Sequence, residues 1–216
     1  MTKFGKILLI AAGLGLVSMP AMAYEKGDWI LRGGVGMVSP ESTAFVDSTE
    51  DLLISVDDGT SAVFTATYMF GPNWGFEILA AWPFSHDIHA GPVDRSVELK
   101  LGETKHLPPT FSFQYHFAPE AKFRPYAGLG LNYTTFFDEK LNQDLFPGFD
   151  MKIDDSFGLA AQLGADLKLN ESWLLNVDVR YINIEPDVTL SDGVDSDKVS
   201  IDINPIVFSI NVGYLF

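Results

Sequence analysis

Apolar and polar residues alternate with a period of two along most of the chain after residue 23. In residues 156–168 the odd positions carry Phe, Leu or Ala, whereas the even positions between them are small or polar. Such alternation is typical of strands whose two faces meet different environments. The pattern predicts eight strands, at residues 28–38, 61–70, 74–82, 110–117, 125–137, 156–168, 173–186 and 198–216.

The connections between these strands alternate in length. Residues 71–73, 118–122 and 169–172 are tight turns, whereas residues 39–60, 83–109, 138–155 and 187–197 are long loops. Short turns at one end and long loops at the other are typical of outer-membrane β-barrels. No stretch after residue 23 holds 18 consecutive apolar residues, so we expect no transmembrane helix. The sequence predicts an all-β fold, an eight-stranded antiparallel transmembrane β-barrel of the outer-membrane type.

A soluble barrel would also alternate, with its apolar face inward and its outer face polar. Here the face opposite the apolar set is rich in Gly and small polar residues, too small for a water-facing surface. Aromatic residues also flank the apolar bands, as membrane interfaces favour. The flanking residues are Trp29, Trp74, Trp82, Tyr115, Tyr133, Trp173, Tyr181 and Tyr214.

The last predicted strand is irregular. Its apolar residues are odd at Val199, Ile201 and Ile203 but even from Phe208 to Phe216, so the pattern changes near Pro205. Proline cannot donate to a sheet ladder, so a bulge is expected there. Alternatively, residues 198–203 lie above the membrane, where the facing of side chains is less constrained.

The N-terminus predicts export. Lys3 and Lys6 precede the short apolar run 7–17, and Ala21-Met22-Ala23 resembles a signal-peptidase cleavage site. We therefore expect a secretory signal peptide at residues 1–23, a barrel domain at residues 24–216, and a location in the bacterial outer membrane.

Charge is concentrated in the predicted loops. The chain has a net charge of -15, and losing the two lysines of residues 1–23 makes the mature chain more acidic still. Loops 39–60, 138–155 and 187–197 carry net charges of −6, −4 and −4. This acidity argues against nucleic acid as a partner. It fits a solvated outer surface, or divalent cations bridging to anionic lipopolysaccharide.

Polar residues on the inward face of the lower strands predict a plug at the periplasmic side of the lumen. Two arginines among three acids, in a lumen only wide enough for side chains, should pair rather than leave a pore. The predicted plug consists of Arg32, Glu77, Gln114, His116, Asp166, Asp178 and Arg180.

Higher in the barrel the inward residues become small or apolar. A hydrophobic solute could enter this funnel, but it could not cross the plug and would have to leave sideways between strands. The alternative is a filled barrel with no passage. The predicted passage-lining residues are Val38, Val63, Leu79, Leu107, Pro108, Phe136, Phe137, Ile182 and Ile184.

Several sequence blocks are similar to the OmpW family of outer-membrane proteins. They include His106-Leu107-Pro108-Pro109-Thr110, Lys122-Phe123-Arg124-Pro125-Tyr126-Ala127-Gly128 and Asn132-Tyr133-Thr134-Thr135-Phe136-Phe137-Asp138. The resemblance covers the mature chain, although Trp82 stands where the family usually has Thr. It implies strands that extend beyond the membrane, a narrow hydrophobic channel that opens laterally, and uptake of small hydrophobic molecules. The loops, especially 39–60 and 138–155, are this chain's own.

No residue set predicts catalysis. Ser156, His116 and Asp166 fall at different depths without a nucleophile motif around them, so we expect no enzyme and no cofactor. His86 and His89 are spaced as a metal pair would be on a helix, but they lie in a loop, so we expect no metal site.

The expected partners are outer-membrane lipids and lipopolysaccharide, small hydrophobic solutes, and the outer-membrane assembly machinery, which would recognise the C-terminal Phe216. The alternative function is a structural or receptor barrel, for adhesion, phage or colicin, with no open passage.

Overall fold

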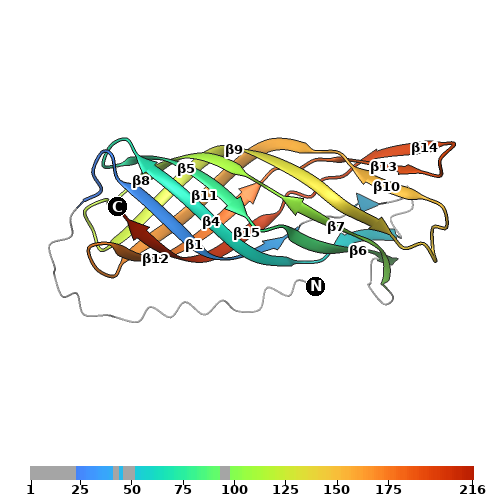
Figure 1. The fold of residues 1–216 in the computed structure, drawn as a ribbon, viewed down its shortest axis with the longest axis horizontal. Coiled ribbons are helices and arrows are strands. Elements are labelled where there is room, and N and C mark those ends of the chain that lie inside the picture. Colours follow the sequence, from blue (N-terminus) through green and yellow to red (C-terminus); the bar gives the residue numbers. More distant parts are fainter. Residues whose placement is uncertain (1–22, 41–43, 46–51, 93–97) are drawn as a thin grey trace.

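A computed structural model describes residues 23–40, 44–45, 52–92 and 98–216. Its described part is an elongated, closed antiparallel barrel (Figure 1). Each wall strand pairs with its sequence neighbour in the wall, β1 pairs with β15, and β9 pairs with β11. The eight wall strands are β1 (Trp29–Ser39), β4 (Gly59–Met69), β5 (Trp74–Ala81), β8 (Thr110–His116), β9 (Phe123–Leu141), β11 (Ser156–Lys168), β12 (Trp173–Ile182) and β15 (Ile206–Leu215). The predicted eight-stranded barrel is confirmed, whereas the predicted signal peptide lies almost wholly outside the described residues.

Much of the sequence predicted as long loops is strand. These strands continue the barrel at the end opposite the C-terminus (Figure 1), and the prediction of loops was wrong there. β3 pairs with β6, β6 with β7 and β7 with β9, whereas β10, β13 and β14 form a separate three-stranded sheet. The extension strands are β2 (Ala44–Phe45), β3 (Leu52–Val56), β6 (Phe84–Pro92), β7 (Leu99–Leu107), β10 (Asp150–Ile153), β13 (Asp187–Ser191) and β14 (Ser196–Ser200).

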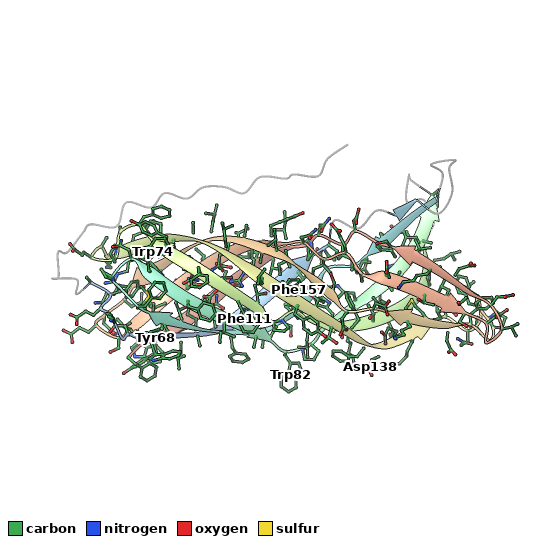
Figure 2. All side chains as sticks on the ribbon, turned by 90° about the horizontal axis from the view of Figure 1, so that it is seen from above. Tyr68, Trp74, Trp82, Phe111, Asp138 and Phe157 are labelled. Atoms are coloured by element: carbon green, nitrogen blue, oxygen red, sulfur yellow. The ribbon has the colours of Figure 1, made fainter. Side chains whose placement is uncertain are left out.

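The lower barrel has an apolar outer face, as a lipid-facing wall requires. Leu129, Phe157 and Leu163 are among its most exposed side chains. Trp74 and Tyr68 lie near one end of this band and Trp82 near the other (Figure 2). Trp74 packs edge-on against Tyr115, with ring centroids 4.9 Å apart. No helix in the described part of the chain is long and apolar enough to cross a membrane.

The polarity of the two barrel faces is inverted in the extension. In β15 the inward odd positions below Val207 include Ser209 and Asn211, which are polar and buried. In the segment before it, the odd residues Ile201 and Ile203 line an internal cavity. The odd positions therefore face inward on both sides of Pro205, and what changes is the environment outside the wall.

Asn204 lies where the strand is interrupted, between β14 and β15. Its φ of 38° lies in the left-handed region, which Asn tolerates better than most residues. Its side-chain oxygen accepts hydrogen bonds from the Ile184 amide (3.1 Å) and from Asn183 Nδ2 (3.0 Å). The wall strand begins only at Ile206, so the predicted strand 198–216 was too long, and residues 196–200 belong to β14.

Candidate functional site

Paired charges fill the lower lumen. Arg32 on β1 contacts Asp166 on β11 twice, Nε to Oδ1 at 3.0 Å and Nη2 to Oδ2 at 2.7 Å. The other guanidinium nitrogen, Nη1, donates to Thr67 Oγ1 (2.8 Å) and lies 3.4 Å from Glu77 Oε2. All four side chains are buried. Buried charges persist only when paired and hydrogen-bonded, and this arrangement meets both conditions.

A second arginine extends the network upward. Arg180 Nη2 lies 2.8 Å from Glu77 Oε1 and 3.5 Å from Asp178 Oδ1, and it also contacts Gln162. Tyr126 donates to Asp178 Oδ2 at 2.9 Å. Glu77 therefore joins the two arginines, and the network crosses the whole lumen as one unit. We refer to these residues and the Arg32 cluster together as the charged plug.

Tyr24 closes the plug from below. Its hydroxyl donates to Asp166 Oδ2 at 2.8 Å, and its ring packs edge-on against His116. The Arg124 guanidinium lies 4.1 Å from the centre of the Tyr24 ring. Gln114 is buried on the same strand as His116. Tyr24 was not predicted as a plug residue, because it lies just outside the alternating segments and nothing in the period-two pattern marks it as inward.

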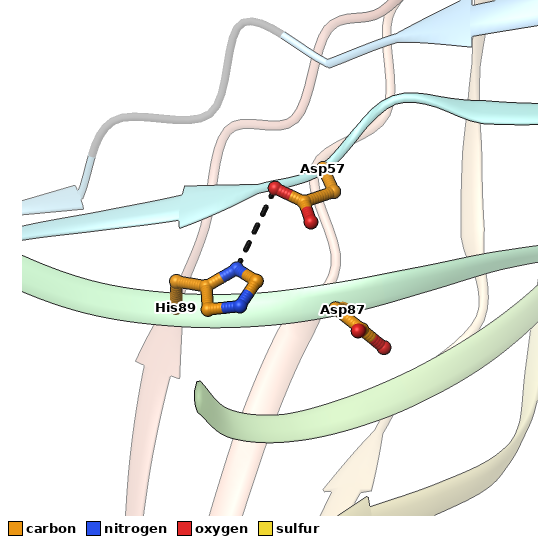
Figure 3. Close-up of side chains that lie close together, drawn as sticks. All are labelled: Asp57, Asp87 and His89. Carbon is orange, nitrogen blue, oxygen red and sulfur yellow. Dashed lines mark ion pairs between the residues drawn. The ribbon is translucent and has the colours of Figure 1, made fainter. Parts of the chain in front are cut away.

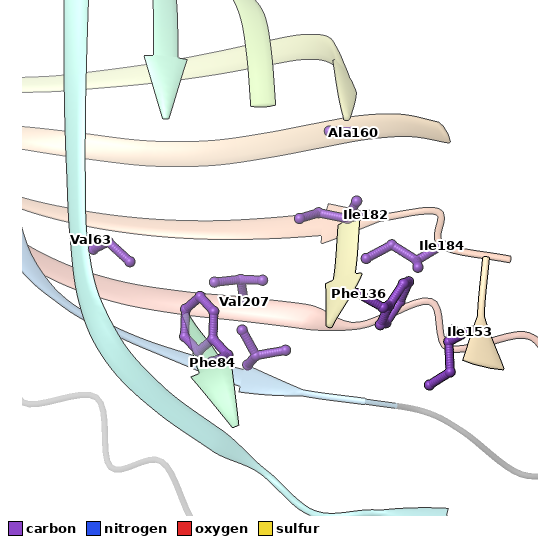
Figure 4. Packing of buried hydrophobic residues seen from close by; sticks show 9 residues of the cluster. Val63, Phe84, Phe136, Ile153, Ala160, Ile182, Ile184 and Val207 are labelled. Atoms are coloured by element: carbon purple, nitrogen blue, oxygen red, sulfur yellow. The ribbon is translucent and has the colours of Figure 1, made fainter. Parts of the chain in front are cut away.

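Above the plug, nine buried apolar side chains fill the barrel (Figure 4). Phe84, Val63 and Val207 lie toward the plug, and Ile184 and Phe136 lie toward the extension (Figure 4). A cavity of only about 10 Å³ remains between this cluster and the plug residues Asp178 and Arg180. It has room for about one water molecule. The lumen is therefore closed to larger solutes at this level.

A larger cavity lies inside the extension, and we call it the upper cavity. Its volume is about 270 Å³, and apolar side chains from the extension and the upper ends of the wall strands line most of it. Ligand sites of this kind bind small molecules mainly through apolar contact, with a few polar groups that fix orientation. The polar lining side chains are His86, Thr104, His106 and the exposed Asp197.

A gap in the sheet ladder lies next to Phe84. The β5–β8 ladder ends at the pair Leu79–Thr110, and the β6–β7 ladder begins at the pair Phe84–His106. Residues 80–83 and 107–109 form no ladder pairs with each other between these points. Pro83, Pro108 and Pro109 have no amide hydrogen to donate. The wall therefore has an unpaired seam, which we call the proline seam, at the top of the lipid-facing band beside Trp82.

The structure brings together most of the residues predicted to line a passage. Val38, Phe136 and Ile184 line the upper cavity. The small cavity below it is also lined by Val38, together with predicted residues nearer the plug, namely Val63, Leu79, Pro108 and Ile182. All seven predicted plug residues are buried in the lower lumen.

Leu107 and Phe137 were placed wrongly. They lie on the outer face of β7 and β9, next to the inward residues His106 and Phe136, and line neither cavity. Phe137 pairs with Lys105, whose ammonium contacts Asp138 at 2.9 Å on the outside. Four further lining residues were not predicted, because their segments were expected to be loops: His86, Ile88, Leu101 and His106. Alternation within residues 84–90 could have identified β6.

His86 and His89 do not form a pair. His86 lines the upper cavity, and a register shift between Ile88 and His89 separates their positions on β6. His89 lies instead near Asp57 and Asp87, with its Nδ1 3.5 Å from Asp57 Oδ1 (Figure 3). Lys100 already contacts Asp87 Oδ1 at 2.8 Å, so a protein cation compensates part of this acidic charge.

Ser156, His116 and Asp166 are not brought together. Ser156 and Asp166 are ten residues apart on β11, which corresponds to about 33 Å of strand. Ser156 Oγ accepts the Glu185 amide at 3.0 Å, whereas Asp166 is paired with Arg32 in the plug. The three side chains therefore do not form the contacts of a catalytic triad.

Comparisons with known proteins agree with this architecture. The model of the OmpW family matches residues 25–216. Outer membrane protein W of Vibrio cholerae serotype O1 is 44% identical over 210 residues, 96% of this chain and 97% of that protein. Outer membrane protein W of Escherichia coli strain K12 is 36% identical over 204 residues, 93% of this chain and 94% of that protein.

Among solved structures, the crystal structure of the outer membrane protein OprG from Pseudomonas aeruginosa is similar, with a TM-score of 0.80 and 38% identity. It covers 90% of this chain and 98% of the OprG chain. These relatives are outer-membrane proteins, and the lipid-facing band described above fits that location. The chain belongs to the OmpW family and is a β-barrel of the outer membrane.

Proposed function

We propose that this barrel is a channel for the facilitated diffusion of small hydrophobic molecules, which leave sideways into the outer leaflet. The observation that carries the proposal is the position of the upper cavity. The upper cavity lies above a lumen that the apolar cluster and the charged plug close. The proline seam lies beside the boundary between the upper cavity and this closed part of the lumen.

The energetics favour a sideways route over a straight one. A hydrophobic solute in the upper cavity would lose its apolar contacts on entering the plug and would have to separate the Glu77–Arg180 and Arg32–Asp166 pairs. Breaking buried pairs costs several kcal/mol each, roughly 3–5 by analogy with other proteins. Passing Phe84 toward the proline seam leads instead to the bilayer, where apolar surface stays out of water.

Cross-linking across the proline seam tests the proposal. Ala80 and Leu107 lie on the outer face on its two sides, and the chain has no cysteine of its own. A strain that produces the Ala80→Cys, Leu107→Cys variant is treated with a bifunctional maleimide, and toluene uptake is measured before and after. We expect cross-linking to reduce uptake toward that of a strain lacking the protein.

The matched control places the same cross-link where the wall is already paired. Ile78 and Phe111 are ladder partners on β5 and β8, and both side chains are exposed. Linking Ile78→Cys to Phe111→Cys should leave toluene uptake unchanged. Equal uptake with and without the wild-type protein would reject the channel and favour a receptor or structural barrel. Equal loss in both cross-linked variants would reject the sideways exit.

A further inference from the structure

One wall of the upper cavity is polar. His86 on β6 and Thr104 and His106 on β7 face inward from adjacent strands, where His86 pairs with Thr104 and Phe84 pairs with His106. The exposed Asp197 is the one other charged or polar side chain that lines the cavity within the described residues. A molecule in this cavity therefore meets apolar side chains on most sides and imidazoles on one side.

The protonation of His86 follows from its contact with the backbone. Its Nδ1 lies 2.7 Å from the carbonyl oxygen of Asp57. A carbonyl oxygen only accepts hydrogen bonds, so the proton of the neutral ring is on Nδ1 and Nε2 carries a lone pair. Burial lowers the pKa of His86 below its usual 6.5 and that of His106 to about 3, so both rings are neutral at pH 7.

Neither Nε2 atom has a hydrogen-bond partner among the described residues, and both atoms are buried. The rings stack on each other, with centroids 4.9 Å apart and an interplanar angle of 13°, and Phe84 stacks on His106. His86 and His106 are 3% and 6% exposed. Buried polar groups without partners are rare, and each calls for an explanation such as a bound molecule.

We propose that the His86–His106 pair binds the polar end of an amphipathic ligand, a small hydrophobic molecule with one hydroxyl that donates to the free Nε2 of His86. The inference rests on the proposed function and names a substrate class for the same cavity. A phenol or an alcohol fits, because its hydroxyl supplies the missing donor and its hydrocarbon part fills the apolar remainder. A plain hydrocarbon of the same size leaves both nitrogens unpaired.

Three probes of nearly equal shape separate hydrogen bonding from general polarity. Toluene has no polar group, 4-methylanisole has an oxygen that only accepts, and p-cresol has a hydroxyl that donates. Binding of each to the purified barrel in lipid nanodiscs is measured by ligand-observed NMR, and uptake is measured in cells. We expect p-cresol to bind about three- to tenfold more tightly than 4-methylanisole, the range of one net hydrogen bond.

Variants test whether His86 is the source of the preference for p-cresol. His86→Phe keeps a planar ring and removes the acceptor, so it should abolish the preference for p-cresol while toluene still binds. His86→Gln retains a side-chain acceptor and should keep part of the preference. His89→Phe is the matched control, because His89 lies on the same strand but does not line the cavity. Native folding of each variant is checked by circular dichroism.

The outcomes distinguish this inference from the proposed function. If none of the three probes binds or enters the cells through the wild-type barrel, the proposed function fails and this inference fails with it. If toluene enters but p-cresol has no advantage over 4-methylanisole, or keeps its advantage in His86→Phe, this inference is wrong and the channel stands. Loss of the preference in His86→Phe but not in His89→Phe supports it.

Discussion

Arg32 and Asp166 form a two-point ion pair although 134 residues separate them in the sequence. The pair joins β1 to β11 across the lumen, because these strands are not neighbours in the wall. Both ends have further partners, Thr67 for the arginine and Tyr24 for the aspartate. The pair therefore braces the barrel internally, in addition to the hydrogen bonds of the wall.

Replacing Arg32 by Met should destabilise the barrel by about 3–5 kcal/mol, because it leaves the buried Asp166 without its counter-charge. Urea unfolding in lipid vesicles measures the loss. The Lys105–Asp138 pair is exposed, so Lys105→Met should cost less than about 1 kcal/mol. Similar losses in the two variants would mean that the plug pair contributes no more than a surface pair.

Removing a charged pair from the plug should leave the passage of ions and of hydrophobic solutes unchanged. In the Glu77→Ala, Arg180→Ala double variant the contact between the two side chains is lost and water can fill the space, but the apolar cluster above still closes the lumen. We expect ion conductance in planar bilayers and toluene uptake by cells to stay at the wild-type level. A rise in toluene uptake would show that solutes pass through the plug.

Phe84→Ala should widen the route between the upper cavity and the proline seam. Phe84 is 1% exposed and lines the small cavity next to Pro108. We expect faster toluene uptake together with a loss of about 3–5 kcal/mol in stability, as for other buried phenylalanines. Ile210→Ala removes an exposed side chain from the lipid-facing surface of β15 and should leave uptake unchanged. Slower uptake in Phe84→Ala would contradict Phe84 as a barrier.

Gly59 determines the position of His86. A Cβ on Gly59 would lie 2.5 Å from His86 Cε1 and 2.9 Å from Nε2. Gly59→Ala should therefore displace the imidazole and weaken the preference for p-cresol over 4-methylanisole. Gly71, in a turn of the lower barrel, has nothing within 4 Å of an added Cβ, so Gly71→Ala should keep that preference.

The extension should lose stability in acid. The pKa of His106 is lowered from 6.5 to about 3 by burial and by the neighbouring His86. The unfolded extension therefore binds more protons than the folded one between these pH values. The contribution of neutral His106 to the stability of the extension is fully present above pH 6.5 and is lost as the pH falls toward 3. Amide hydrogen exchange of β6 and β7, corrected for intrinsic rates, measures it, and His106→Phe should flatten the pH dependence.

Alternation alone predicted the wall and the position of the plug residues, because a lipid-facing strand has one strongly apolar face. Residues such as Gln114 and Asp178 occupy inward positions between outward apolar ones, and the structure places them inside. The pattern does not reveal which of them pair. The pairing depends on which strands face each other across the lumen. The Arg32–Asp166 and Glu77–Arg180 pairs could therefore be identified only from the closed barrel.

The strands of the extension were not predicted by the same alternation, because the polarity of their two faces is inverted. Water surrounds its outer face and apolar side chains point inward, so the outward set is no longer the apolar one. Leu107 and Phe137 are apolar residues on the outer face of this region, and their hydrophobicity suggested the cavity instead. His86 and His106 were missed as lining residues because a polar residue in a presumed loop predicts solvent exposure.

The prolines of the seam have a consequence for the proposed sideways exit. Pro83, Pro108 and Pro109 carry no amide hydrogen, so no rearrangement of the backbone could seal this part of the wall with their hydrogen bonds. Opening of the exit therefore requires no breaking of a ladder at these positions. In the proposed channel, control of the exit would therefore depend on side chains, with Phe84 on the inside and Trp82, 71% exposed, on the lipid side. Passage then becomes a matter of rotamer motion rather than of strand separation.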